Sequence, residues 1–129
     1  MRYVRLKADS AGESHIEQVT LDLSEADYRP PAPMLFVSHS YRADGLQFVR
    51  LPSGWTGESI HPPKAQFFIC LKGHLEVTAS DGDKRTFGPG DSIFDGGYLW
   101  QRSSHAREGY RRVPCSDYSD YCWLIYGGQ

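Results

Sequence analysis

Short apolar segments separated by turn-forming residues recur along the chain, and this rhythm limits what it can fold into. VTLDL, in which Val19, Leu21 and Leu23 alternate with polar residues, is followed by LQFVRL, QFFICL, HLEVTA and CWLIY. Between such segments lie PSGWTG, SDGD and GPGD, whose Pro, Gly and Asp are typical of turns. Short strands at this spacing predict an all-β sandwich or barrel. The only helix candidate, SEADY at residues 24–28, is too short to make a lasting helix.

Three segments allow local predictions. SDGD joins HLEVTA to KRTF, so we expect these strands to pair antiparallel around a glycine with positive φ. QFFICL places Gln66, Phe68 and Cys70 on one face and Phe67, Ile69 and Leu71 on the other. Because both faces are largely apolar, we expect this strand to be covered on both sides. The proline-rich RPPAP, residues 29–33, should run extended along the surface.

Length and charge exclude several classes of protein. A chain of 129 residues fits one domain, with strands and a proline-rich arm in 1–33 and a barrel in 34–126. A net charge of -2 argues against a nucleic-acid binder. No apolar run approaches the roughly 18 residues of a membrane span, and the first residues do not resemble a secretion signal, so we expect a cytoplasmic protein. Three cysteines, an odd number, fit reduced thiols, with Cys70 in the core.

The stretch from Gly54 to Gly97 resembles the cupin superfamily. The segments RPPAP, LPSGW, HPPKAQF and FGPGD together resemble its small single-domain bacterial, RmlC-like members. In the family's first motif, a glycine precedes His-x-His, and a glutamate and a second glycine follow. Here Gly73 closes the motif, Gln66 stands at the glutamate and His61 at the second histidine, while Ser59 replaces the first. The resemblance implies a cupin-type antiparallel β-barrel, the double-stranded β-helix or jelly roll.

The family's second motif maps onto GPGDSIFDGGYLWQRSS, residues 88–104. Gly97 matches a motif glycine, Asp95 replaces a proline, and Trp100 occupies the position of a histidine ligand. His105 could stand in for that ligand if the turn holds extra residues. Cupin metals are held by imidazoles and one carboxylate, a set that suits Fe, Mn, Ni or Zn. The resemblance therefore leaves a reduced metal set of His61, Gln66 and His105, or no metal at all.

The same residues have other interpretations. His61 could be a general acid–base assisted by Tyr98, or could simply hydrogen-bond a backbone carbonyl. Gln66 needs a polar partner because an amide facing a core is costly, and that partner could be a ligand, a water or His61. With Gln66, Phe68 and Trp100 are the residues that we expect to line a ligand site.

Three functions remain open: an enzyme with a reduced metal site, running oxygenase, lyase or isomerase chemistry; a metal-free isomerase, epimerase or cyclase that uses His61; and a non-catalytic module that binds a metabolite. The expected partners are a small molecule and a second copy in a homodimer, since small barrels often bury an edge strand or apolar face against a twin.

Overall fold

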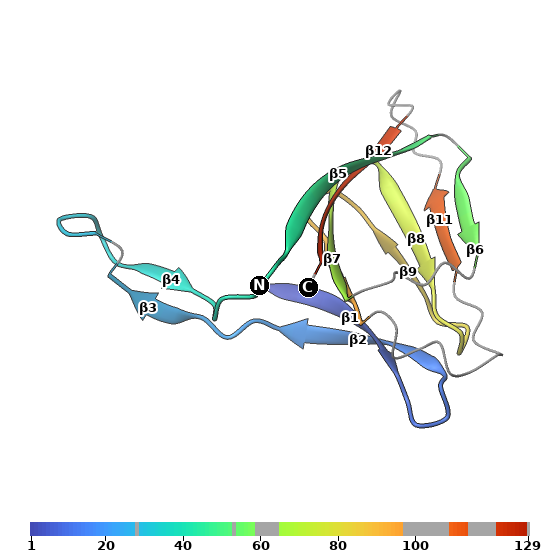
Figure 1. Cartoon of the computed structure of the whole chain (residues 1–129), viewed down its shortest axis with the longest axis horizontal. Helices are drawn as coiled ribbons and strands as arrows, with labels where there is room; N and C mark the ends of the chain where they lie inside the picture. Colours follow the sequence, from blue (N-terminus) through green and yellow to red (C-terminus); the bar gives the residue numbers. More distant parts are fainter. Residues whose placement is uncertain (28, 53, 59–64, 97–108, 114–120, 129) are drawn as a thin grey trace.

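The computed structural model describes residues 1–27, 29–52, 54–58, 65–96, 109–113 and 121–128, with only the backbone described for 58, 109–113 and 121–128. Every regular element in these ranges is a β-strand (Figure 1). The strands are β1 (Arg2–Ala8), β2 (Ser14–Thr20), β3 (Ser24–Ala26), β4 (Leu35–Val37), β5 (Gly45–Pro52), β6 (Thr56–Glu58), β7 (Gln66–Lys72), β8 (His74–Thr78), β9 (Lys84–Phe87), β10 (Ser92–Asp95), β11 (Gly109–Val113) and β12 (Tyr121–Gly128). Within the same ranges, no helix has the length and apolarity that a membrane crossing requires.

Two sheets enclose a common interior. The larger has six strands in the order β2-β1-β10-β7-β12-β5, and the smaller has four in the order β6-β11-β8-β9. Figure 1 shows the two sheets facing each other, while β3 and β4 form a separate two-stranded unit outside the barrel. Strands β1 and β10 pair in parallel, and the other described pairs are antiparallel. The predicted all-β jelly roll is confirmed.

The core lies between the two sheets, and period-two alternation supplies it. In β8 the inward residues Leu75 and Val77 are buried, while their neighbours are partly exposed. Cys70 is 3% exposed, as expected for a core thiol. Each fully buried large apolar side chain contributes roughly 1.5–3 kcal/mol. The buried apolar residues are Leu6, Leu51, Cys70, Leu75, Val77, Ala79, Phe87 and Ile93.

The hairpin predicted around SDGD is present. Strands β8 and β9 pair antiparallel, with Thr78 opposite Lys84 at the turn. Gly82 has a φ of 92°, which a residue with a Cβ rarely adopts. The prediction of this pairing from the four turn residues is therefore confirmed.

The proline-rich segment between β3 and β4 differs from expectation. Residues 24–26 of SEADY form β3, which pairs with β4 in the register Ser24 to Val37. RPPAP does not run extended along the surface, because the Ala32 N–H donates to the Arg29 carbonyl at 2.8 Å and the chain reverses there. Figure 1 shows this turn at the outer tip of a hairpin that projects away from the barrel.

Strand β7 is covered on one face more fully than on the other. Its inward residues Gln66 and Cys70 are buried, but on the outer face Ile69 is 38% and Leu71 is 42% exposed. The expectation that both sides are covered is wrong for this half of the strand, because the second sheet lies on the inner side only. The outward Phe67 is covered by aromatic rings, which are those of Tyr3, Tyr41 and Phe94 at centroid distances of 5.4, 5.3 and 4.8 Å.

Candidate functional site

Two polar side chains lie on the inner face of the six-stranded sheet at one end of the barrel. Gln66 begins β7 and Asp95 ends β10, and the two residues are directly opposite in the antiparallel register. Their inward neighbours along the strands are apolar, since Ile93 belongs to the core and Phe68 packs against it. Gln66 is 7% and Asp95 only 1% exposed. The apolar interior therefore becomes polar at this end.

Gln66 is buried, and the part of the chain that the structure describes offers no hydrogen-bond partner for its amide. No described residue forms a hydrogen bond with its side chain. An amide needs both donors and an acceptor satisfied, and leaving such a group buried and unpaired costs about 1–3 kcal/mol by mutational data. Native proteins keep few groups of this kind, and each calls for a physical explanation such as a bound water, ion or ligand.

The same end of the barrel is where two connections between the sheets begin and end. One connection leaves β6 after Glu58 and enters β7 at Gln66, and the other leaves β10 after Asp95 and enters β11 at Gly109. Glu58 is paired with Gly109, just as Gln66 is paired with Asp95. Both connections therefore run between the same two residue pairs, Gln66 with Asp95 on the six-stranded sheet and Glu58 with Gly109 on the four-stranded sheet.

The structure places two of the predicted site residues. Gln66 and Phe68 share the inner face of β7, and Phe68 is half-buried against the core. The other four, His61, Tyr98, Trp100 and His105, lie outside the described residues. In the sequence His61 belongs to the connection that leads into Gln66, and the other three belong to the connection that follows Asp95. Their roles stay predictions.

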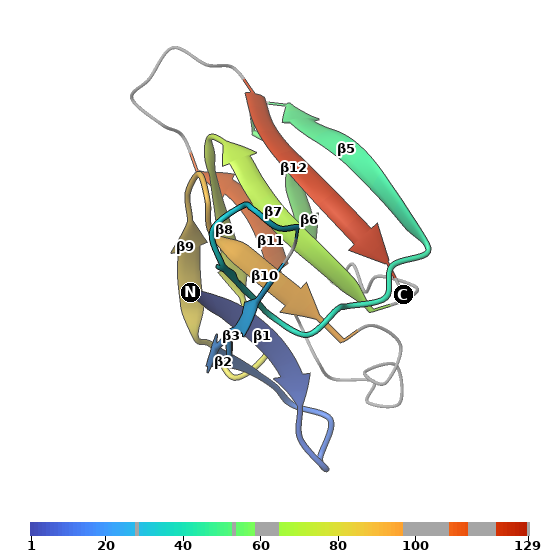
Figure 2. The same ribbon diagram turned by 90° about the vertical axis from the view of Figure 1, so that its left-hand side faces the viewer.

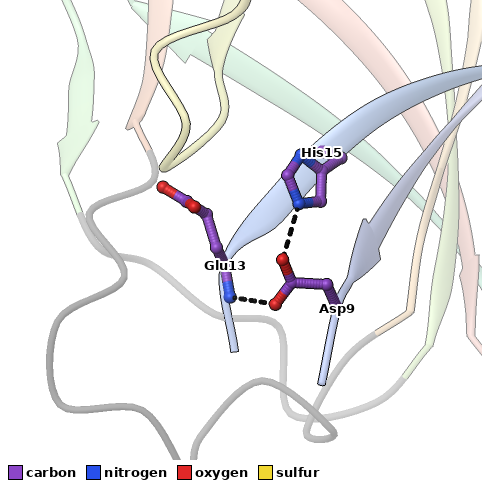
Figure 3. Close-up of side chains that lie close together, drawn as sticks. All are labelled: Asp9, Glu13 and His15. Atoms are coloured by element: carbon purple, nitrogen blue, oxygen red, sulfur yellow. Dashed lines mark hydrogen bonds and ion pairs between the residues drawn. The ribbon is translucent and has the colours of Figure 1, made fainter. Parts of the chain in front are cut away.

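A second polar group lies at the turn between β1 and β2. Asp9, Glu13 and His15 each offer a ligand atom, and these atoms lie within 4.8 Å of one another (Figure 3). His15 is held at both ring nitrogens, with Nε2 2.9 Å from Asp9 Oδ2 and Nδ1 2.7 Å from Asp81 Oδ2. A shallow depression of about 300 Å³, lined partly by Lys7 and Ala8, lies beside it.

Hydrogen bonds link this group to the β8–β9 turn, and we call the linked residues Asp9, Ser14, His15, Ser80 and Asp81 the clamp. Ser14 and Ser80 exchange hydrogen bonds, each backbone N–H donating to the other hydroxyl at 2.6 Å. Ser14 is fully buried. Ser80 and Asp81 belong to the β8–β9 turn of the four-stranded sheet, so these contacts tie the two sheets together.

Charge stabilises the clamp. Hydrogen bonds to Asp9 and then to Asp81 raise the pKa of His15 above its ordinary value. His15 in turn is the largest cause of the lowered pKa of Asp9, while the Asp83 backbone N–H and then His15 lower that of Asp81. An imidazolium between two carboxylates has no free lone pair for a metal ion. The His and carboxylate groups present fit a metal only after the imidazole loses its proton and one of these bonds.

Sequence reasoning missed Asp95 and this clamp. The motif comparison counted Asp95 only as a departure from a proline, although a carboxylate inside the alternating segment SIFD is a signal of a polar inner position. His15 has no ligand spacing to another histidine, and its partner Asp81 is 66 residues away. No local pattern could have joined them.

The chain is similar to one protein family and to several solved structures. Residues 47–101 match the sequence model of the family described as Cupin domain. Among solved structures, KdgF from Halomonas sp. is 19% identical over 82% of this chain and 86% of its own, with a TM-score of 0.43. A putative ethanolamine utilization protein from Salmonella typhimurium is 10% identical over 99% and 94%, with a TM-score of 0.43. A cupin superfamily protein from Desulfitobacterium hafniense is 12% identical over 69% and 82%, with a TM-score of 0.42.

No curated protein matched the chain. The cupin-domain match covers β7 to β10, including both Gln66 and Asp95, and the two facing sheets have the jelly-roll form that the match requires. Residues 47–101 of the chain are therefore similar to a cupin domain.

Proposed function

We propose that this protein binds a small polar organic molecule inside the barrel, at the end that carries Gln66 and Asp95. The observation that carries the proposal is the buried amide of Gln66, which no described residue satisfies. A ligand that offers both an acceptor and a donor would satisfy this amide, since an amide buried without a partner costs about 1–3 kcal/mol. Ligand pockets commonly combine an apolar lining with a few such polar groups.

The lining fits a molecule with an apolar part as well. Phe68 packs on the same face as Gln66, and the core side chains Leu6 and Ile93 lie next to Asp95 in register or along the strand. A compact organic acid, amide or sugar derivative presents polar atoms to Gln66 and carbon atoms to this wall. Asp95, when ionised, favours hydroxyl or amine donors over a second carboxylate at its own position.

His61 is the residue that would turn binding into catalysis. It lies five residues before Gln66 in the connection that enters β7, so the chain holds it within about 18 Å of that site at full extension. An imidazole with a pKa near neutrality can remove and return a proton, with Tyr98 as its assistant. This supports isomerase, epimerase or cyclase chemistry as the catalytic form of the proposal.

The position of Asp95 supports a second candidate function, which is metal-assisted catalysis. The cupin motif has Gln66 in place of its glutamate, which leaves the metal set of His61, Gln66 and His105 without a carboxylate. Asp95 lies opposite Gln66 and could supply that charge. Imidazole and oxygen donors of this kind fit Fe, Mn, Ni or Zn, and such an ion would polarise a substrate carbonyl or hydroxyl.

Fragment binding tests the site itself. A library of small acids, amides and polyols is screened by ligand-observed NMR, and each hit is repeated with Gln66→Leu and with the matched control Gln18→Leu, whose residue is exposed on β2. We expect hits to be lost in Gln66→Leu and kept in Gln18→Leu. Hits that bind both variants equally would place the site elsewhere.

Elemental analysis separates the two catalytic forms. Protein purified without a tag or chelator is measured for Fe, Mn, Ni and Zn, beside His61→Ala and Asp95→Asn. Close to one ion per chain, lost in both variants, supports the metal-assisted form. Absence of metal after reconstitution, together with fragment binding that depends on Gln66, supports the metal-free form.

A further inference from the structure

The turn between β1 and β2 gathers three possible metal ligands on the surface of the barrel. Asp9 follows β1, Glu13 precedes β2, and His15 is the second residue of β2. One ligand atom from each lies within 4.8 Å of the other two, and Figure 3 shows the three side chains together at this turn. Both carboxylates are exposed, and the imidazole is partly buried. A single turn therefore brings an imidazole and two carboxylates within reach of one ion.

The imidazole of His15 is oriented as in a metal ligand. Its Nδ1 lies 2.7 Å from Oδ2 of Asp81. Oδ1 of Asp81 accepts the backbone N–H of Asp83 at 2.8 Å, so both oxygens of this carboxylate are fixed. Histidines that bind metals almost always donate their other ring N–H to a carboxylate or a carbonyl in this way. With its proton on Nδ1, His15 presents the lone pair of Nε2 to Asp9, whose Oδ2 is 2.9 Å away.

Asp9 holds the turn with one oxygen and faces the imidazole with the other. Its Oδ1 accepts the backbone N–H groups of Ala11 at 2.8 Å and Glu13 at 3.0 Å, while Oδ2 lies beside Nε2 of His15. Two ligand atoms at about 2.1 Å from one ion lie about 3.0 Å apart when their bonds meet at a right angle. The distance of 2.9 Å between Nε2 and Oδ2 is therefore already that of two neighbouring ligands.

The carboxylate of Glu13 has no role in the clamp. Its side chain forms no hydrogen bond or ion pair with any residue that the structure describes. Ligand atoms on opposite sides of one ion lie at most about 4.2 Å apart, so a carboxylate within 4.8 Å of the other two ligand atoms needs a shift of about 1 Å or less. An exposed side chain without a partner among the described residues can make that shift at little cost.

The charge at this turn favours a divalent cation. Asp9, Glu13 and Asp81 carry three negative charges, and a protonated His15 offsets only one of them. A divalent ion bound to the neutral imidazole offsets two, so it relieves more of the repulsion between the carboxylates. Lys7 lines the same depression, but it is exposed, so water and salt screen its charge.

We propose that Asp9, Glu13 and His15 bind one Zn²⁺, with Asp81 as the residue that positions the imidazole. The ion takes the place of the proton on Nε2, which is released to water, and it replaces the hydrogen bond between Nε2 and Asp9. An imidazole with two carboxylates suits Zn²⁺, whereas Mg²⁺ and Ca²⁺ prefer oxygen ligands alone. The depression of about 300 Å³ beside Asp9 and His15 leaves room for the water that completes the coordination.

This site lies on the outside of the barrel and does not rest on the proposed function. Figures 1 and 2 show the β1–β2 turn projecting beyond the end of the barrel. Leu6 is the β1 residue that pairs with Asp95, and Asp9 follows it by three residues, about 10 Å along an extended chain. Through Asp81, the ion holds this turn of the six-stranded sheet against the β8–β9 turn of the other sheet. Because the ion binds the folded chain, thermal stability should rise with zinc concentration.

Isothermal titration calorimetry with ZnCl₂ tests the proposal on the full chain, purified without a metal-binding tag and stripped of metal with EDTA. NMR of the imidazole nitrogens follows the same titration, because zinc on His15 moves the Nε2 signal of that residue. The variants are Glu13→Gln, Asp81→Asn and His15→Gln, and the matched control is Glu25→Gln, which removes an exposed carboxylate of β3. Thermal melts in EDTA check that each variant is folded.

We expect the wild type and Glu25→Gln to bind one Zn²⁺ with equal affinity and to show the shift of the His15 signal. Asp81→Asn should weaken binding roughly 10–100-fold, as the loss of an orienting carboxylate does. Glu13→Gln removes a ligand and should weaken binding at least as much, yet its melting temperature in EDTA should equal that of the wild type. His15→Gln should abolish binding at this turn.

Three results would overturn the proposal. The first is a wild type that takes up no zinc, which leaves the group as a clamp only. The second is zinc uptake that leaves the Nε2 signal of His15 unchanged, which places the ion elsewhere on the chain. The third is a Glu13→Gln protein with the zinc affinity of the wild type, which removes the carboxylate from the ligand set.

Discussion

Gln66→Leu should make the folded protein more stable while removing its ligand site. The substitution keeps a similar side-chain volume at a position that is 7% exposed, and it removes an amide that no described residue satisfies. Burying an unsatisfied amide costs about 1–3 kcal/mol, so the free energy of unfolding should rise by about that amount. For a chain of this length each kcal/mol corresponds to roughly 3–6 °C in melting temperature. Stability gained at the expense of binding is typical of residues kept for function.

Urea titration followed by tryptophan fluorescence and far-UV circular dichroism measures the change. The control Gln18→Leu removes an exposed amide and should alter the free energy of unfolding by no more than about 0.5 kcal/mol. If Gln66→Leu instead lowers the free energy of unfolding by more than about 1 kcal/mol, the amide has a structural partner. No ligand is then needed to satisfy this side chain.

Three further perturbations test the fold around the site. The raised pKa of His15 means that the clamp stabilises the fold fully below about pH 6.5 and loses this contribution as pH rises through the folded pKa. The lowered pKa values of Asp9 and Asp81 mean a second loss of stability as pH falls below about 3.8. In thermal melts, the stability difference between wild type and His15→Gln should therefore be largest between these two pH limits and shrink by pH 9. Leu6→Ala, at a core residue 2% exposed, should lower the free energy of unfolding in urea by about 2–5 kcal/mol, and a loss below 1 kcal/mol would contradict the assigned core. Gly82→Ala meets no neighbouring atom within 4 Å, so calorimetry should register only the backbone strain of a φ of 92°, about 1–2 kcal/mol.

Local chemistry in the sequence determined many of the strands and the pairing of β8 with β9. The alternation in HLEVTA and the glycine of SDGD were enough to define β8, β9 and their turn, because both signals act over a few residues. Cys70 and Gln66 were correctly placed on one face of β7, since side chains alternate along any strand. The same alternation could not tell which face meets the second sheet.

Only the tertiary structure decided which side chains from distant segments of the chain meet. Asp95 meets Gln66, 29 residues earlier in the sequence, through the pairing of β10 with β7, and His15 meets Asp81 through the packing of two turns. The outer side chains Ile69 and Leu71 have a core-like sequence but remain exposed in a single copy. The sequence pattern of a strand indicates the hydrophobicity of each position but does not indicate which element covers it. Long-range register and association are set by the whole chain and by its partners.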